Sequence, residues 1–214
     1  MAGFRPSQDL VFTPLAVTGD DGASWSAGVL DAALADVPDA LAAGPAGRGG
    51  MLALLADGTV QFSARGGTGW TTLASRRSVA ATAAGRRCGL RALTAVAFGP
   101  AGTPMVGGAC TRAGTAGVFA RAAGTWRAAG PALPASLARQ NVTVLRLATA
   151  ADGTAALLAA GSGQADSLVA GWSAGGGAWA ESPPLRLGGP QVTSASFAPG
   201  GITAVVLPGR PARP

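Results

Sequence analysis

The sequence predicts an all-β fold, namely a β-propeller of about four blades, each blade being a four-stranded antiparallel sheet. Four tryptophans follow glycine-rich turns at spacings of 45, 56 and 53 residues, and they are Trp25, Trp70, Trp126 and Trp179. Turns between apolar segments recur at spacings of 55, 51 and 48 residues, at Gly47, Gly102, Gly153 and Gly201. Two independent markers therefore share a period of about 50 residues, which is typical of propeller blades repeated in tandem.

The unit that begins at Leu90 shows the expected strands best. Its short apolar segments are 91–98, 103–110, 115–122 and 125–133, with turns between them. Within the first segment, Leu93, Ala95 and Ala97 alternate with Thr94, Val96 and Phe98. Both sets are mostly apolar, so we expect a sheet that is covered on both faces.

A helical fold is the competing interpretation, because alanine is the best helix former. The segment 29–43 could form a helix, but Pro38 interrupts it. The same phase of the other repeats is strand-like, so the repeat pattern favours strands here too.

The repeats divide a single domain, 1–214, into units. Three are complete, at about 37–80, 88–135 and 141–190, and the fourth combines 1–36 with 191–214. Segments 9–17 and 24–30 would supply its third and fourth strands, and segments 192–198 and 202–207 its first and second. Joining the two termini would close a four-bladed ring and predicts a monomer. The alternative is an open piece of a larger propeller.

One turn contains a specific motif. Its pattern is S/T-x-D-x-G-x-S/T-W, and the matching residues are Thr18, Asp20, Gly22, Ser24 and Trp25. The motif resembles the Asp-box of BNR-repeat propellers, the architecture shared by sialidases and many non-enzymatic relatives. The resemblance implies a structural turn in which the carboxylate of Asp20 accepts backbone N–H groups and the tryptophan packs between strands. A metal ligand is the alternative role for Asp20.

Sialidase chemistry, which the resemblance would imply, needs a tyrosine nucleophile, an arginine triad and an acid/base residue. The chain has no tyrosine, no histidine and a single glutamate, Glu181. No motif identifies a triad among its arginines. We therefore predict no catalytic residue, no metal site and no cofactor in this chain.

The charge of the chain favours an acidic partner. All 16 basic residues are arginines, and the net charge of +6 is spread over the chain. GC-rich codons account for much of the arginine content. The two doublets, Arg76/Arg77 and Arg86/Arg87, lie in connections between repeats and are the candidate recognition residues; solvated loops are the alternative. Nucleic acid is a disfavoured partner, because no basic stripe is interleaved with aromatic residues.

The two cysteines bear on the compartment. Cys88 and Cys110 flank one predicted hairpin, so antiparallel pairing brings them close, and we predict a disulfide; two buried thiols are the alternative. A disulfide would indicate an oxidising compartment and a secreted or cell-surface protein. Residues 1–10 contain no apolar segment of a signal peptide, and no apolar run of about 18 residues predicts a membrane span.

The function that these observations predict is a non-catalytic propeller module for binding or scaffolding. Its expected partner is a glycan or a protein, of acidic character. The alternative is a fragment of a sialidase-like glycoside hydrolase whose catalytic residues lie outside this chain.

Overall fold

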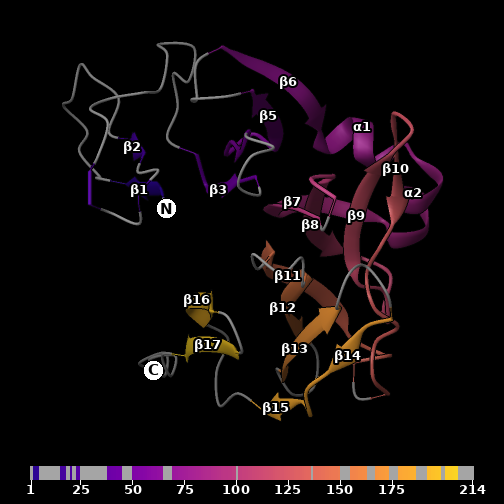
Figure 1. Ribbon diagram of the computed structural model, residues 1–214. Coiled ribbons are helices and arrows are strands. Elements are labelled where there is room, and N and C mark those ends of the chain that lie inside the picture. Colours follow the sequence, from indigo (N-terminus) through magenta and orange to yellow (C-terminus); the bar gives the residue numbers. More distant parts are fainter. Residues whose placement is uncertain are drawn as a thin grey trace, which may run out of the picture.

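The computed structural model confirms the all-β prediction, because most of the described chain consists of antiparallel strands (Figure 1). The structure describes residues 2–4, 15–17, 20, 23–24, 38–44, 50–64, 69–99, 101–135, 137–149, 155–162, 167–173, 178–186, 192–198 and 201–206.

The first complete sheet has four strands in chain order. They are β3 (Ala40–Ala43), β4 (Met51–Leu54), β5 (Thr59–Ser63) and β6 (Trp70–Ser75), each antiparallel to the next. Two short helices follow, α1 (Arg76–Ala80) and α2 (Ala83–Cys88).

The next two units share a nine-stranded sheet. One contains β7 (Leu90–Phe98), β8 (Pro104–Cys110), β9 (Gly117–Ala122) and β10 (Thr125–Ala128). The other contains β11 (Asn141–Thr149), β12 (Ala155–Ser162), β13 (Ser167–Ser173), β14 (Ala180–Glu181) and β15 (Leu185–Arg186). Between the units, β8 and β11 meet at a single pair, Thr143 and Ala109, so each unit is largely a sheet of its own.

Two hairpins complete the described strands. Near the N-terminus, β1 (Ala2–Phe4) pairs with β2 (Leu15–Val17), and near the C-terminus β16 (Val192–Ala198) pairs with β17 (Gly201–Val206). The expected strand at 9–17 thus contributes β2, and of its expected partner at 24–30 only Ser24 is described. No strand pair among the described residues joins the two hairpins, so ring closure remains a prediction.

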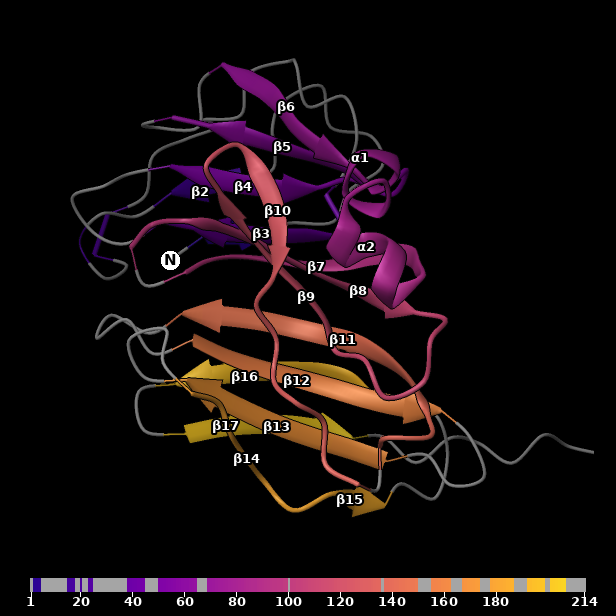
Figure 2. The same ribbon diagram turned by 90° about the vertical axis from the view of Figure 1, so that its right-hand side faces the viewer.

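The middle unit lies between its neighbours, with β3–β6 on one side and β11–β13 on the other (Figure 2). Two hydrophobic clusters cover it. Val96 and Phe98 of β7 belong to a cluster shared with β4, β5 and the helices, whereas Ala95 and Ala97 belong to one shared with β11 and β13. The middle sheet is therefore apolar on both faces, as the mostly apolar alternation predicts.

Leu93 departs from the predicted alternation. It packs in the cluster of Val96 and Phe98, not in that of Ala95 and Ala97. The cause is an irregularity in the pairing of β7 with β8, whose register shifts between Leu93 and Ala95. A bulge of this kind breaks the period of two and turns the preceding side chain to the other face.

Hydrogen bonds between the two units match the sequence period. The hydroxyl of Thr94 donates to the carbonyl of Val144, 50 residues away, and that of Thr149 to the carbonyl of Phe98, 51 residues away. The indole Nε1 of Trp179 donates to the carbonyl of Ala129 over 2.9 Å, again 50 residues away. The two units are thus in direct contact through residues that lie about one period apart in the sequence.

Candidate functional site

The connection that carries the predicted recognition residues consists of α1 and α2. Ser75 caps α1: its hydroxyl accepts the N–H of Ser78 at 3.1 Å, and the hydroxyl of Ser78 accepts the N–H of Ser75 at 2.9 Å. Thr82 caps α2 by accepting the N–H of Gly85 at 3.1 Å. These caps satisfy N–H groups that are unpaired at the start of a helix, so two short helices form where the sequence analysis placed only a connection.

Gly89 ends α2 in the left-handed conformation, with φ of 64°. A β-carbon at this position would clash with the hydroxyl oxygen of Thr111, so glycine is required here both for its conformation and for space. The tight end of the helix directs the chain into β7 beside the end of β8.

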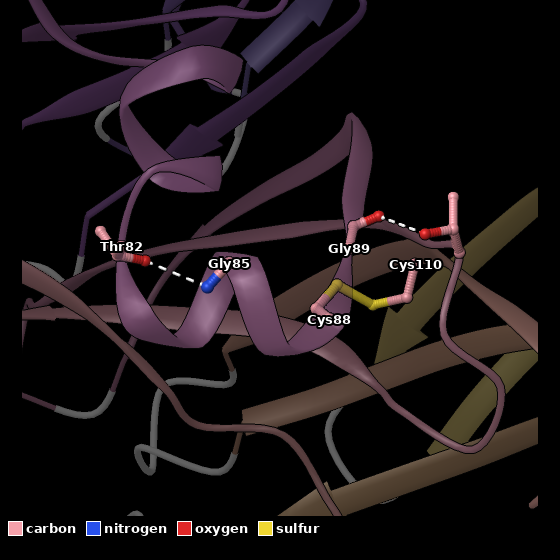
Figure 3. The surroundings of a disulfide bond; sticks show 6 residues. Thr82, Gly85, Cys88, Gly89 and Cys110 are labelled. Carbon is pink, nitrogen blue, oxygen red and sulfur yellow. Dashed lines mark hydrogen bonds between the residues drawn. A yellow bond between two sulfur atoms is a disulfide. The ribbon is translucent and has the colours of Figure 1, made fainter.

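The disulfide between Cys88 and Cys110 fastens this corner of the molecule (Figure 3). The sulfur atoms lie 2.06 Å apart and the Cα atoms 5.1 Å apart. Hydrogen bonds beside it extend the attachment: the N–H of Thr111 donates to the carbonyl of Gly89 at 3.1 Å, and that of Arg112 to the carbonyl of Cys88 at 3.1 Å. The end of α2 is therefore held to the end of β8 covalently and by backbone pairing.

The helices bury one side and expose the other. Val79, Ala84 and Cys88 are buried in the cluster that also contains Leu90 and Trp126. The predicted recognition residues are all exposed on the outer side: Arg76, Arg77, Arg86 and Arg87.

None of these four arginines forms an ion pair with a carboxylate in the part of the chain that the structure describes. One guanidinium nitrogen of Arg86 donates to the carbonyl of Ala81, near the end of α1. Arg86 and Arg87 lie in the last turn of α2, where a positive charge is favourable. The arginines are thus displayed from a capped and disulfide-bonded platform with their charge available to a partner.

The described part of the motif at Thr18–Trp25 is its Asp and its Ser. The N–H of Ser24 donates to Oδ1 of Asp20 at 2.8 Å, and the hydroxyl of Ser24 donates to Oδ2. The N–H of Ala23 also bonds the backbone carbonyl of Asp20 at 3.2 Å. Thr18, Gly22 and Trp25 lie outside the described residues.

A second carboxylate makes a similar turn that the sequence analysis missed. Asp57, between β4 and β5, accepts the N–H of Thr59 at 2.7 Å and its hydroxyl at 2.9 Å. The signal available in the sequence was an Asp-Gly-Thr run between two apolar segments.

Glu181, the single glutamate, lies on β14 opposite Gly171 of β13. Burial raises its pKa above the usual value, and its Oε1 is buried with no hydrogen-bond partner among the described residues. No group of three or more His, Cys, Asp or Glu residues that could hold a metal ion occurs in the described ranges.

No protein-family model and no curated protein sequence matches this chain. Among the helices that the structure describes, none is both long enough and apolar enough to span a membrane. The class that the structure establishes is an antiparallel β protein with a cysteine pair at disulfide distance, and the arginines of α1 and α2 are its candidate site.

Proposed function

We propose that the chain is a non-catalytic β-propeller module that binds or scaffolds an acidic glycan or protein partner through Arg76, Arg77, Arg86 and Arg87. One observation carries the binding role. All four arginines are exposed on a platform whose conformation is set by two helix caps and a disulfide, and no described carboxylate neutralises them. Side chains presented from a rigid scaffold lose less conformational freedom when they bind.

The propeller architecture is supported by how the repeats stack. Each repeat pairs its own strands in chain order, and consecutive repeats contact each other face to face through residues 50 or 51 positions apart. The C-terminal hairpin, β16 and β17, is a two-strand unit of the kind that begins each repeat. An N-terminal pair that completed this unit would close the ring and leave few exposed sheet edges.

Export follows from the disulfide if it is present in the cell. Cys88 and Cys110 are 1% and 4% exposed, so the bond would be shielded from reductants in solution. Structural disulfides persist in oxidising compartments, so the disulfide favours a secreted or cell-surface location for this protein.

The experiment that tests the binding role is a panel of immobilised ligands probed with the purified chain. The panel contains acidic and neutral oligosaccharides of equal length, and acidic and neutral peptides. We expect retention by at least one acidic ligand, and a loss of about tenfold or more in affinity for the variant R76Q/R77Q/R86Q/R87Q. Equal retention by neutral ligands, or none by any ligand, would contradict the proposal.

The second candidate function is a fragment of a sialidase-like glycoside hydrolase. The turn of Asp20 favours this superfamily, because its carboxylate accepts the N–H of Ser24, which is the structural role that the resemblance to the Asp-box implies. Its catalytic tyrosine and acid/base pair would have to come from residues outside this chain.

A further inference from the structure

The positive charge of this protein is concentrated in one stretch of the chain. Residues 58–151 contain 11 of the 16 arginines and none of the ten acidic residues. The preceding residues, 1–57, hold seven acidic residues and two arginines, and 152–214 hold three of each. The sequence analysis described the net charge as spread over the chain, and this description was wrong, because the positive charge is concentrated in residues 58–151. Codon bias explains arginine in place of lysine, but it does not explain why carboxylates are missing from this stretch.

Four arginines of this stretch lie on the backbone segments that the disulfide joins. They come from three backbone segments: the end of α2, the start of β7 and the residues after β8. All four side chains are exposed. We name this group the arginine corner, and its members are Arg86, Arg87, Arg91 and Arg112.

The backbone geometry brings the corner together. Leu90 pairs with Cys110 and Ala92 with Ala109, so Arg91 is the extra residue of a bulge. Arg112 lies across from α2, because its N–H donates to the carbonyl of Cys88 at 3.1 Å. Its Cγ atom would lie 3.5 Å from a β-carbon placed on Gly89. Arg87, Arg91 and Arg112 therefore lie on segments whose backbones are held together at Cys88 and Cys110.

The arginine corner destabilises the folded state when no ligand is bound. Like charges on neighbouring segments repel, and the described residues provide no carboxylate partner to these arginines. A fixed group of uncompensated cations is expected to be stabilised by an anionic ligand.

We propose that the arginine corner binds a linear acidic polysaccharide, a polymer with carboxylate or sulfate groups on successive sugars; this inference rests on the proposed function and names its partner class. Guanidinium groups bind carboxylates and similar anions in a bidentate manner. Arginines displayed from three segments match a ligand that repeats its anionic group along a chain.

Two observations favour a polysaccharide over nucleic acid. The disulfide indicates an oxidising compartment, where acidic polysaccharides are abundant polyanions. Single-stranded nucleic acid is held by aromatic side chains that stack on bases. The large exposed hydrophobic residues in the described ranges are Trp172 and Leu185, which lie on β13 and β15 and not at the corner.

The test compares two triple variants with the same change in charge. The corner variant is R87Q/R91Q/R112Q, and the control is R146Q/R186Q/R213Q, whose arginines all lie after residue 140 in the sequence. Arg86 stays unchanged because it bonds the carbonyl of Ala81. Binding to fluorescently labelled alginate and heparin oligosaccharides is measured by anisotropy over a range of salt concentrations, with neutral dextran and double-stranded DNA as further probes. Thermal unfolding of each variant verifies its fold.

We expect the wild-type chain to bind alginate, heparin or both, and not dextran. The corner variant should bind about tenfold or more weakly and with a smaller salt dependence, while the control should lose less than about threefold. Reduction of the disulfide in the wild-type chain should weaken binding less than the corner variant does, because the backbone hydrogen bonds from Thr111 to Gly89 and from Arg112 to Cys88 remain.

Other results would overturn the inference in distinguishable ways. Equal losses for the corner and control variants would mean that overall charge, not the corner, binds the polymer. Tighter binding of DNA than of either polysaccharide at the same salt would reject the partner class. Retention of an acidic peptide without any polysaccharide binding would reject the inference but keep the proposed function, whereas no binding to any acidic ligand would reject both.

Discussion

Breaking the bond between Cys88 and Cys110 should destabilise the protein by an amount that depends on the number of residues between the two cysteines. The two cysteines are 22 residues apart, and closing a loop of that length in the unfolded state corresponds to about 3 kcal/mol. For a chain of this size, that loss lowers the melting temperature by roughly 6 to 12 °C. Reduction of the wild-type protein is the cleanest perturbation, because both sulfurs pack in the core with Leu90 and Trp126 and stay in place.

The assay is urea unfolding of the oxidised and reduced protein, paired with intact mass after alkylation. Without reductant, alkylation of the unfolded chain should add no label, and after reduction it should add two. A free-energy difference below about 1 kcal/mol would refute the loop-closure reasoning. Two labels without reductant would refute the disulfide itself, and with it the main argument for export.

Four further outcomes are expected. The chain should hydrolyse no fluorogenic sialoside, and turnover that is lost in Arg77→Ala would contradict the binding-module proposal. Deletion of 191–214 should abolish cooperative thermal unfolding if the ring is closed, and scattering from the intact chain should give a radius of gyration of about 17 Å; little effect of the deletion would indicate an open fragment. Asp57→Ala should cost about 1 kcal/mol in urea unfolding because two bonds to Thr59 are lost, and a similar loss in Asp39→Ala, whose exposed carboxylate makes no such turn, would contradict this role. Burial raises the pKa of Glu181, so above the usual pKa of 4.5 the folded state binds more protons than the unfolded state. The free energy of unfolding should therefore fall as pH rises through the folded-state pKa, and Glu181→Gln should remove that pH dependence. An unchanged pH dependence in Glu181→Gln would mean that another group causes it.

The repeat pattern was visible in the sequence because turn glycines and tryptophans recur at similar spacings. Gly102 shows why: it occupies the turn between β7 and β8 with φ of 73°, a conformation that favours glycine. The strand order agrees with the spacing, since Trp70 and Trp126 each lie in the fourth strand of a unit, β6 and β10. Period and strand class were thus predictable, whereas ring closure remains a prediction, because it needs a long-range pairing of the two hairpins that no described strand pair shows.

The helices were missed for a different reason. With five and six residues, α1 and α2 are too short to show a period of 3.6. The usable signals were their boundaries: Ser75 and Thr82 as caps at the start, and Gly89 at the end. The face of the sheet on which Leu93 lies was also unpredictable, because the apolar alternation in the sequence does not show where a bulge occurs.

The candidate site was half predictable. The exposure of Arg76, Arg77, Arg86 and Arg87 followed from their place in a connection between units, and the pairing of the cysteines followed from their positions on either side of one hairpin. Arg91 and Arg112 were overlooked, although each lies within three residues of a cysteine. Once the two cysteines are joined, their neighbours must share one corner of the surface.

The burial of the middle sheet explains why its charges gather where they do. A sheet covered on both faces has no polar face, so β7 and β8 carry apolar or small residues along most of their length. Charged side chains can therefore lie only at the ends of strands, on the edge strand or in the connections. Arg91, Arg112 and Arg127 occupy such positions. In this architecture the residues that can bind a partner are therefore separate from those that hold the fold. Replacing exposed arginines should change binding while leaving the core clusters and the stability of the sheet nearly unaltered.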